Sequence, residues 1–153
     1  MSGKPVRLPA RVRELDMGGL EQALGFRLRV LEQTVMRSFA RHMDPLELSP
    51  TLYSILVLIA ANPACRQIEL AQALSMHQPN LVDRVALLME RRLVVRRGDA
   101  KDRRANVLAL STEGQRFMPR VRAAHEAHLA EIRELLGTAR YAALLQLSDP
   151  TGL

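Results

Sequence analysis

The sequence predicts a mainly α-helical fold that carries one small β-hairpin. Apolar residues recur at helical spacing through most of the 153-residue chain. Only two runs, residues 93–97 and 106–110, are short, rich in Val and Leu, and typical of strands. Just before them, a three-residue break at 75–77 separates two short helical runs. Helix, turn, helix and hairpin in this order predict a winged helix-turn-helix core, with longer helices flanking it on both sides.

The chain begins with a basic arm, residues 1–18, in which four positive charges outnumber two negative ones. The next segment, residues 19–46, contains a continuous apolar stripe at helical spacing. The stripe consists of Leu24, Leu28, Leu31, Val35 and Phe39. A stripe of about six turns is longer than a small helical core needs, so we expect a dimerisation helix here.

Three helices are expected within the core segment, residues 47–111. The longest apolar run, Ile55–Ala61, belongs to a buried helix. The run 67–74 places Ile68, Leu70, Ala71 and Leu74 on one buried side. The run 78–92 repeats Leu81, Val85 and Leu88 at i, i+4 and i+7.

The other side of the 78–92 helix carries mostly polar residues in its first two turns. They are Gln78, Pro79, Asn80, Asp83 and Arg84. Asn and Gln pair with adenine and Arg pairs with guanine in the major groove, and recognition helices meet base edges in their first turns. Pro79 is tolerated there because the first backbone donors of a helix have no partner within it. An ordinary solvated helix carries the same residue types. The location of these residues in the first two turns therefore favours DNA contact more than their chemical types do.

The hairpin is strongly basic. Residues 91–104 contain seven basic and two acidic residues, a net charge of +5 in a chain whose formal net charge is +6. The tip between the strands, residues 98–105, is longer than the roughly two to five residues that hairpin loops usually need. We therefore expect a tip kept for contact with DNA, through Lys101, Asp102, Arg103 and Arg104. A solvated charged face is the alternative.

Two further helices are expected in the segment 112–153. The first begins at a cap formed by Ser111 or Thr112 and runs to Leu136, with a bend at Pro119. Its inner face consists of Phe117, Val121, Ala124, His128, Ile132 and Leu135. Thr138 is expected to cap the last helix, which runs to Leu147. We expect both helices to contribute to dimerisation.

Residues 48–114 closely resemble the MarR family of bacterial transcriptional regulators, and a looser similarity extends over residues 20–147. The most specific element is the wing pattern, in which Asp102, Arg103 and Arg104 precede a β-run that ends in Leu and Ser and is followed by Gly. The resemblance implies that Arg104 enters a minor groove and that Asp102 orients it through a salt bridge. A planar, permanently charged guanidinium suits a narrow groove of negative potential.

Two positions depart from the pattern of the family. Ser75 stands in the turn where glycine is common, and His77 stands where Ser or Thr usually caps the recognition helix. These departures weaken the local helix signals without changing the assignment.

The resemblance further implies a homodimer that binds double-stranded DNA at a palindromic operator, as a repressor released by a small-molecule effector. Such effectors are often phenolic or aromatic acids, and we also consider their thioesters. They bind between the dimerisation helices and the winged helix. The candidate effector residues are Met36, Arg37, Arg41, His42, Met43 and Tyr53. Each of them could equally be an ordinary rim or core residue.

Three alternatives remain open from sequence. A redox-responsive regulator could use Cys65, whose neighbour Arg66 would lower the pKa of the thiol. A metal-responsive regulator could use His125 and His128 with Glu131 or His42, although no tetrahedral set is complete in sequence. A winged-helix module could instead bind an acidic protein through its basic hairpin.

Other classes of protein are disfavoured by what the sequence lacks. No apolar run reaches the ~18 residues of a membrane span, and the basic N-terminal arm is not followed by the apolar region of a secretory signal. A single cysteine rules out an intramolecular disulfide. Nucleophile motifs, phosphate-binding glycine loops and carboxylate pairs are missing. We expect a cytoplasmic protein that is not an enzyme, with no cofactor, no metal and no membrane contact.

Overall fold

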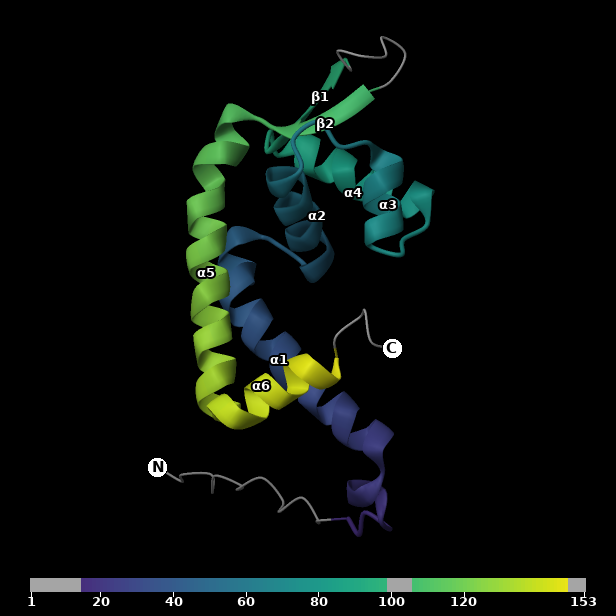
Figure 1. Cartoon of the computed structure of the whole chain (residues 1–153), viewed down its shortest axis with the longest axis vertical. Helices are drawn as coiled ribbons and strands as arrows, with labels where there is room; N and C mark the ends of the chain where they lie inside the picture. Colours follow the sequence, from purple (N-terminus) through teal and green to yellow (C-terminus); the bar gives the residue numbers. More distant parts are fainter. Residues whose placement is uncertain (1–14, 99–105, 149–153) are drawn as a thin grey trace, which may run out of the picture. The chain divides into compact units, whose positions relative to one another are not determined.

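The structure is a computed structural model that describes residues 15–98 and 106–148. Its internal contacts divide the chain into two compact units, Met1–Thr34 and Val35–Leu153. The described elements are six α-helices, two short 3-10 helices and two strands (Figure 1). The predicted mainly helical fold with one hairpin is therefore confirmed. The predicted contacts of Lys101, Asp102, Arg103 and Arg104 lie outside the described residues, as do the first fourteen residues of the arm.

The first unit contains the 3-10 helix η1 (Leu20–Gln22) and the first turns of α1 (Leu24–Met43). The prediction that the helix begins at Gly19 is wrong. Gly18 and Gly19 have positive φ angles of 57° and 86°, so they form a turn and the α-helix starts at Leu24. Within the single chain, apolar side chains of this unit are exposed, including Leu24 at 71% and Leu28 at 52%.

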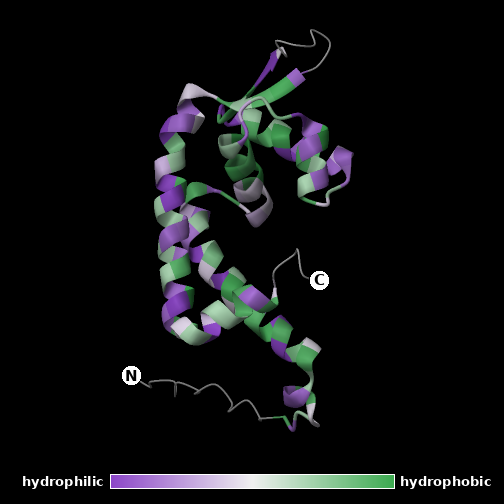
Figure 2. Ribbon diagram, viewed as in Figure 1, coloured by the Kyte–Doolittle hydropathy of each residue, from purple (hydrophilic) through white to green (hydrophobic). Residues whose placement is uncertain are grey.

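The second unit contains the end of α1, the 3-10 helix η2 (Asp44–Leu46) and α2 (Pro50–Ala61). Ser49 caps α2, because its side chain accepts a hydrogen bond from the backbone N–H of Leu52. Helix α2 is mostly apolar (Figure 2) and its buried side chains are Leu52, Ile55, Leu56 and Ile59. The prediction of a buried helix in this part of the chain is confirmed.

Helices α3 (Gln67–Ala73) and α4 (Gln78–Glu90) form the helix-turn-helix. Leu81, Val85 and Leu88 of α4 are fully buried, as predicted. In α3 the predicted burial of Ile68 is wrong, since that side chain is 43% exposed while its neighbours Leu70 and Ala71 are buried. A seven-residue helix has less than two turns with which to cover the core, so one of its apolar positions faces solvent.

The turn between α3 and α4 contains the two sequence departures. Ser75 has a φ of 49°, the left-handed conformation that glycine adopts without strain. The backbone N–H of Met76 donates to the carbonyl of Ala71 at 2.9 Å, which closes the end of α3. His77 is the extended residue before α4 and makes no side-chain cap. The chain therefore forms the helix-turn-helix geometry without the usual turn and cap residues.

The strands β1 (Val94–Gly98) and β2 (Asn106–Leu110) pair antiparallel, with Val94 opposite Leu110. The first strand starts one residue later than predicted. Cys65 extends the sheet through a bridge to Leu108, whose N–H donates to the carbonyl of Cys65 at 2.8 Å. The middle of β2 is thus anchored to the connection between α2 and α3.

Helices α5 (Thr112–Leu136) and α6 (Thr138–Leu147) complete the chain. The side chain of Ser111 caps α5 by accepting from the N–H of Gly114 at 2.9 Å, as predicted. Pro119 lies inside α5, which continues past it. Gly137, with a φ of 77°, rather than Thr138 precedes α6. Of the predicted inner face, Val121, His128 and Ile132 are buried, whereas Leu135 is 59% exposed.

Gly114 marks the closest approach between α5 and the hairpin. A Cβ at this position would collide with the backbone carbonyl of Leu93. We predict that Gly114→Ala lowers the free energy of unfolding by about 1–3 kcal/mol or more, because backbone atoms cannot yield as a flexible side chain can. Gly25→Ala is the control, since nothing lies within 4 Å of its Cβ position. Urea unfolding of both variants should separate them, and equal stabilities would contradict the close approach.

Candidate DNA interface and effector site

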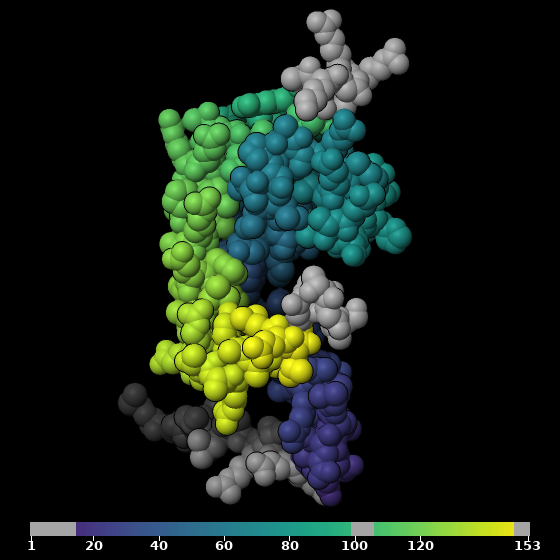
Figure 3. Space-filling view, in the orientation of Figure 1, coloured from purple at the N-terminus to yellow at the C-terminus, as the bar shows by residue number. Residues whose placement is uncertain are grey.

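The solvent-facing side of α4 carries the predicted DNA-contacting residues. Gln78, Pro79, Asn80, Asp83 and Arg84 are all exposed. Pro79 and Asp83 lie opposite the buried stripe of the same helix, and Gln78, Asn80 and Arg84 flank it. In the space-filling view, α3 and α4 lie on the side of the winged-helix core away from α5 (Figure 3). The geometry leaves the first two turns of α4 free to enter a groove as one rigid face.

Strand β1 adds positive charge to the hairpin. Arg96 and Arg97 are exposed on it, two residues after the buried Val94. Because β1 follows α4 after a short turn, the basic strand and the polar face of α4 belong to one continuous stretch of chain. Exposed guanidinium groups beside a recognition helix can neutralise phosphates.

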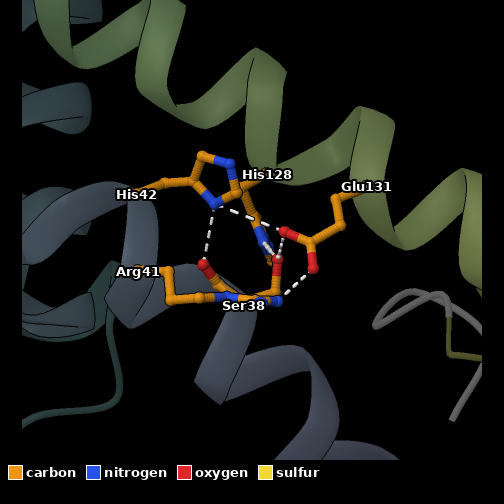
Figure 4. Close-up of polar contacts among 5 residues, drawn as sticks. All are labelled: Ser38, Arg41, His42, His128 and Glu131. Atoms are coloured by element: carbon orange, nitrogen blue, oxygen red, sulfur yellow. Dashed lines mark hydrogen bonds and ion pairs between the residues drawn. The ribbon is translucent and has the colours of Figure 1, made fainter.

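A polar network with a buried centre at Ser38 and His128 joins α1 to α5 (Figure 4). The hydroxyl oxygen of Ser38, which is 1% exposed, lies 2.9 Å from Nδ1 of His128 and 2.9 Å from Oε2 of Glu131. A carboxylate only accepts, so the single hydroxyl proton of Ser38 is donated to Glu131. The hydroxyl must then accept from His128, which places the proton of the neutral imidazole on Nδ1.

Two more side chains of α1 complete this network. The guanidinium of Arg41 forms an ion pair with Glu131. His42 contacts the carbonyl of Ser38 through Nδ1 at 2.8 Å and lies 3.7 Å from Oε2 of Glu131. Glu131 is therefore the shared acceptor that draws three polar residues of α1 onto α5.

Aromatic rings extend from this network toward α2. The ring of Phe39 lies 5.6 Å from those of both Tyr53 and His128. The rings of Tyr53 and His125 are 4.7 Å apart and tilted by 31°, close to a stacked arrangement. In Figure 1, α2 lies between α5 on one side and α3 and α4 on the other, so this stack forms where α2 faces α5.

A cavity of about 240 Å³ opens between α2 and α5 beside the stacked rings. Its lining combines apolar and ionisable side chains: Tyr53, Val57, Ala60, Ala61, Met118, Val121, Arg122, His125 and Glu126. Such a mixture suits a small ligand with an apolar body and a polar end.

Burial shifts the titration of the aromatic groups in this region. It raises the pKa of Tyr53 above 10.0. It lowers the pKa of His125 below 6.5, although Glu126 opposes the change. The pKa of His128 is also lowered, first by burial and then by the neighbouring His125 and His42, while Glu131 opposes the shift. Both imidazoles are therefore kept neutral near pH 7.

The predicted effector residues lie in different environments. Tyr53 lines the cavity, and Arg41 and His42 belong to the polar network. Met43 is fully buried in the core, while Met36 and Arg37 are exposed. The sequence does not predict that five residues of α5 line this cavity, namely Met118, Val121, Arg122, His125 and Glu126. Their spacing of three and four residues predicts that they share one face of a helix. It does not predict that this face lies against Tyr53.

Cys65 does not have the environment of a reactive thiol. It is 8% exposed, and burial together with the carboxylate of Glu69 raises its pKa, whereas Arg66 was expected to lower it. Within residues 15–98 and 106–148, no three or more His, Cys, Asp or Glu side chains are arranged to hold a metal ion. In the same residues, no single helix is long and apolar enough to cross a membrane.

The fold and this site define a winged helix-turn-helix transcriptional regulator. The model of the MarR family matches residues 46–105. A Thauera aromatica protein, the proposed transcriptional regulator of the hcr operon, is 34% identical over 120 residues, which are 78% of this chain and 71% of the relative. The chain belongs to the MarR family.

Solved structures of the repressor CouR have the same fold. CouR bound to a 23-mer DNA duplex superposes with a TM-score of 0.83 and 32% identity, covering 92% of this chain and 100% of CouR. CouR bound to p-coumaroyl-CoA gives a TM-score of 0.77 and 32% identity, covering 88% of this chain and 94% of CouR. The predicted DNA-binding, ligand-responsive character of the family is thus confirmed among relatives.

The histidine cluster predicts acid sensitivity. In the folded chain the pKa values of His125 and His128 are lower than the value of 6.5 expected in the unfolded chain. As the pH falls below about 7, the unfolded chain therefore binds more protons than the folded chain. The melting temperature should therefore fall as pH drops from about 7 to about 5. The drop should shrink in His128→Asn, whose amide can still donate to Ser38, and shrink further when His125→Gln is added. Differential scanning calorimetry measures the melting temperature across this pH range. If the double variant lost as much melting temperature as the wild type, the two histidines would not be the cause.

Proposed function

We propose that the chain is a homodimeric repressor that works in the cytoplasm, binds a palindromic double-stranded operator and is released by an aromatic acid or acyl thioester. The observation that carries this proposal is α4, whose buried stripe leaves Asn80 and Arg84 on an open polar face. The relatives bound to DNA and to p-coumaroyl-CoA support the two halves of the proposal. No catalytic chemistry is required of the chain.

Dimerisation is supported by apolar surface that the single chain leaves uncovered. Exposed apolar side chains occur on residues 15–36 and at the end of α5 and in α6. They are Leu15, Met17, Leu20, Leu24, Leu28, Val30, Met36, Leu135, Leu145 and Leu147. Covering them with a second copy buries apolar area, and a two-fold dimer presents two α4 helices to a palindrome.

DNA reading divides between α4 and the wing. In the proposal, Gln78, Asn80 and Arg84 contact base edges in a major groove. Pro79 and Asp83 shape the same face, and Lys101, Asp102 and Arg103 support Arg104 at the adjacent minor groove. Base contacts would then specify the operator, while the wing supplies charge and shape recognition.

The two parts of the interface should fail differently when mutated. Arg104→Ala should weaken binding to every duplex and make the salt dependence shallower, by up to about one phosphate equivalent per subunit. Asn80→Ala or Arg84→Ala should cost about 1–3 kcal/mol on the selected operator and relax preference at one half-site position. Fluorescence anisotropy at several salt concentrations measures both effects.

Arg140→Ala, which removes the same charge from α6, is the control and should leave both quantities unchanged. If Arg104→Ala binds with unchanged affinity and salt dependence, the wing does not touch DNA. That result would favour the alternative of a winged-helix module for an acidic protein partner.

The effector site is proposed where the cavity between α2 and α5 meets the polar network. An aromatic ring can stack on Tyr53 and His125, and Arg122 can pair with an anionic group. The exposed Met36 and Arg37, together with Arg41 and His42, are proposed to contact the remainder of a larger thioester, while Met43 supports them from the core. The relative that binds p-coumaroyl-CoA supports this ligand class.

A ligand at this site should stabilise the folded protein by mass action. Because a released repressor must bind its ligand more tightly in the DNA-free form, the same ligand should weaken DNA binding by reciprocity. We predict both effects with p-coumaroyl-CoA or benzoyl-CoA, and neither with acetyl-CoA or free coenzyme A. His125→Ala should weaken the response about fivefold, the value of one aromatic contact. Arg116→Gln, an exposed α5 variant outside the cavity, should respond like the wild type. An aromatic panel that changes neither melting temperature nor DNA affinity would contradict the ligand class.

A further inference from the structure

Arg91, the residue that follows α4, reaches back to the connection between α1 and α2. Its Nη1 donates to the carbonyl of Glu47 at 2.7 Å and its Nη2 donates to the carbonyl of Leu46 at 2.8 Å. Nη2 also lies 3.8 Å from the carboxylate of Glu47. Two charge-assisted hydrogen bonds from one guanidinium thus join segments that are 44 and 45 residues apart.

The carbonyls that Arg91 holds belong to a turn that is also closed by two backbone hydrogen bonds, from Glu47 to Asp44 and from Leu48 to Met43. Glu47 has a φ of 53°, a left-handed conformation that costs free energy in a residue other than glycine. The turn lies between Leu46 and Leu48, which are buried in the core. The planar fork of Arg91 can satisfy two neighbouring carbonyls at once, which the single ammonium of lysine does with poorer geometry.

The same guanidinium also contacts α5, since it lies 5.9 Å from the ring centre of Phe117. One side chain therefore links the end of α4, the end of the connection that follows α1, and the first turns of α5. The guanidinium of Arg120 also lies 5.7 Å from the centre of the Phe117 ring, but the carbonyls of Leu46 and Glu47 are held by Arg91. This difference provides a matched control.

We propose that Arg91 is a positioning residue that holds the recognition helix against the α1–α2 connection and thereby sets the spacing between the two recognition helices of the dimer. The proposal rests on the proposed function, in which α1 dimerises and α4 reads DNA. Adding one base pair between half-sites moves one of them by about 3.4 Å and roughly a tenth of a turn. A rigid link at Arg91 makes that displacement costly, and a loose link makes it tolerable.

The first test needs no DNA. Hydrogen exchange of the Glu47 and Leu48 amides, which donate to Asp44 and Met43, reports whether the turn is held. Arg91→Gln should speed their exchange about tenfold, the effect of losing about one net hydrogen bond. Arg120→Gln removes the same charge beside the same ring and should leave both rates unchanged. Unchanged rates in Arg91→Gln would overturn the link.

The second test measures spacing. Duplexes enriched by the wild-type chain from a random pool are remade with one base pair added or removed between the half-sites. The wild type and Arg120→Gln should lose about tenfold or more in affinity on the altered duplexes. Arg91→Gln should lose less than about fivefold in affinity on the same duplexes. The loss for Arg91→Lys should lie between those of the wild type and Arg91→Gln. Arg91→Lys also serves if the glutamine variant does not fold.

Three outcomes separate the explanations. A shallower salt dependence with an unchanged spacing penalty would make Arg91 a phosphate contact and overturn the positioning role. Faster exchange with an unchanged spacing penalty would make it a structural contact only, which also overturns that role. If the wild type enriches no duplex, the proposed function fails, while the exchange rates still decide whether the link exists.

Discussion

The structure depends on how α4 is held in the core. Leu81, Val85 and Leu88 lose all their exposed surface, which is worth on the order of 1.5–3 kcal/mol for each side chain. This burial fixes the rotation of α4 about its own axis, because the helix cannot turn without exposing the stripe. The polar face that contains Asn80 and Arg84 then points outward by necessity. In the proposed function, DNA recognition is thus a consequence of core packing on another side of the same helix.

The polar contacts within the second unit connect elements that hydrophobic packing alone would leave free to slide. Ser38 and His128 are the buried polar pair of the described core, and Glu131 draws Arg41 and His42 to the same point. Directional bonds of this kind specify one register between α1 and α5 more than they add stability. The cavity between α2 and α5 lies beside this junction. In the proposed function, a ligand there changes the register that the network holds, and the change reaches the DNA-binding helices.

Much of the fold could be predicted because its signals are local. The stripe of α4 and the limits of β2 follow from periodicity and composition, and Ser111 follows from cap chemistry. The start of α1 could not be predicted, because it depends on the left-handed backbone of Gly18 and Gly19. The cavity was missed for a different reason. Periodicity reveals which face of α5 is buried, but only packing between distant segments brings His125 onto Tyr53. Arg91 looked like part of a basic cluster, because its carbonyl partners lie far away in sequence.

Dimethyl sulfate protection of an enriched duplex tests the central claim most directly. The reagent methylates guanine N7 in the major groove and adenine N3 in the minor groove, so one experiment reports both sites of contact. The account predicts protected guanines in two successive major grooves, about ten base pairs apart and related by two-fold symmetry, with protected adenines in the flanking minor grooves. Guanines that remain fully reactive in the bound complex would contradict the assignment of α4 as the helix that reads DNA.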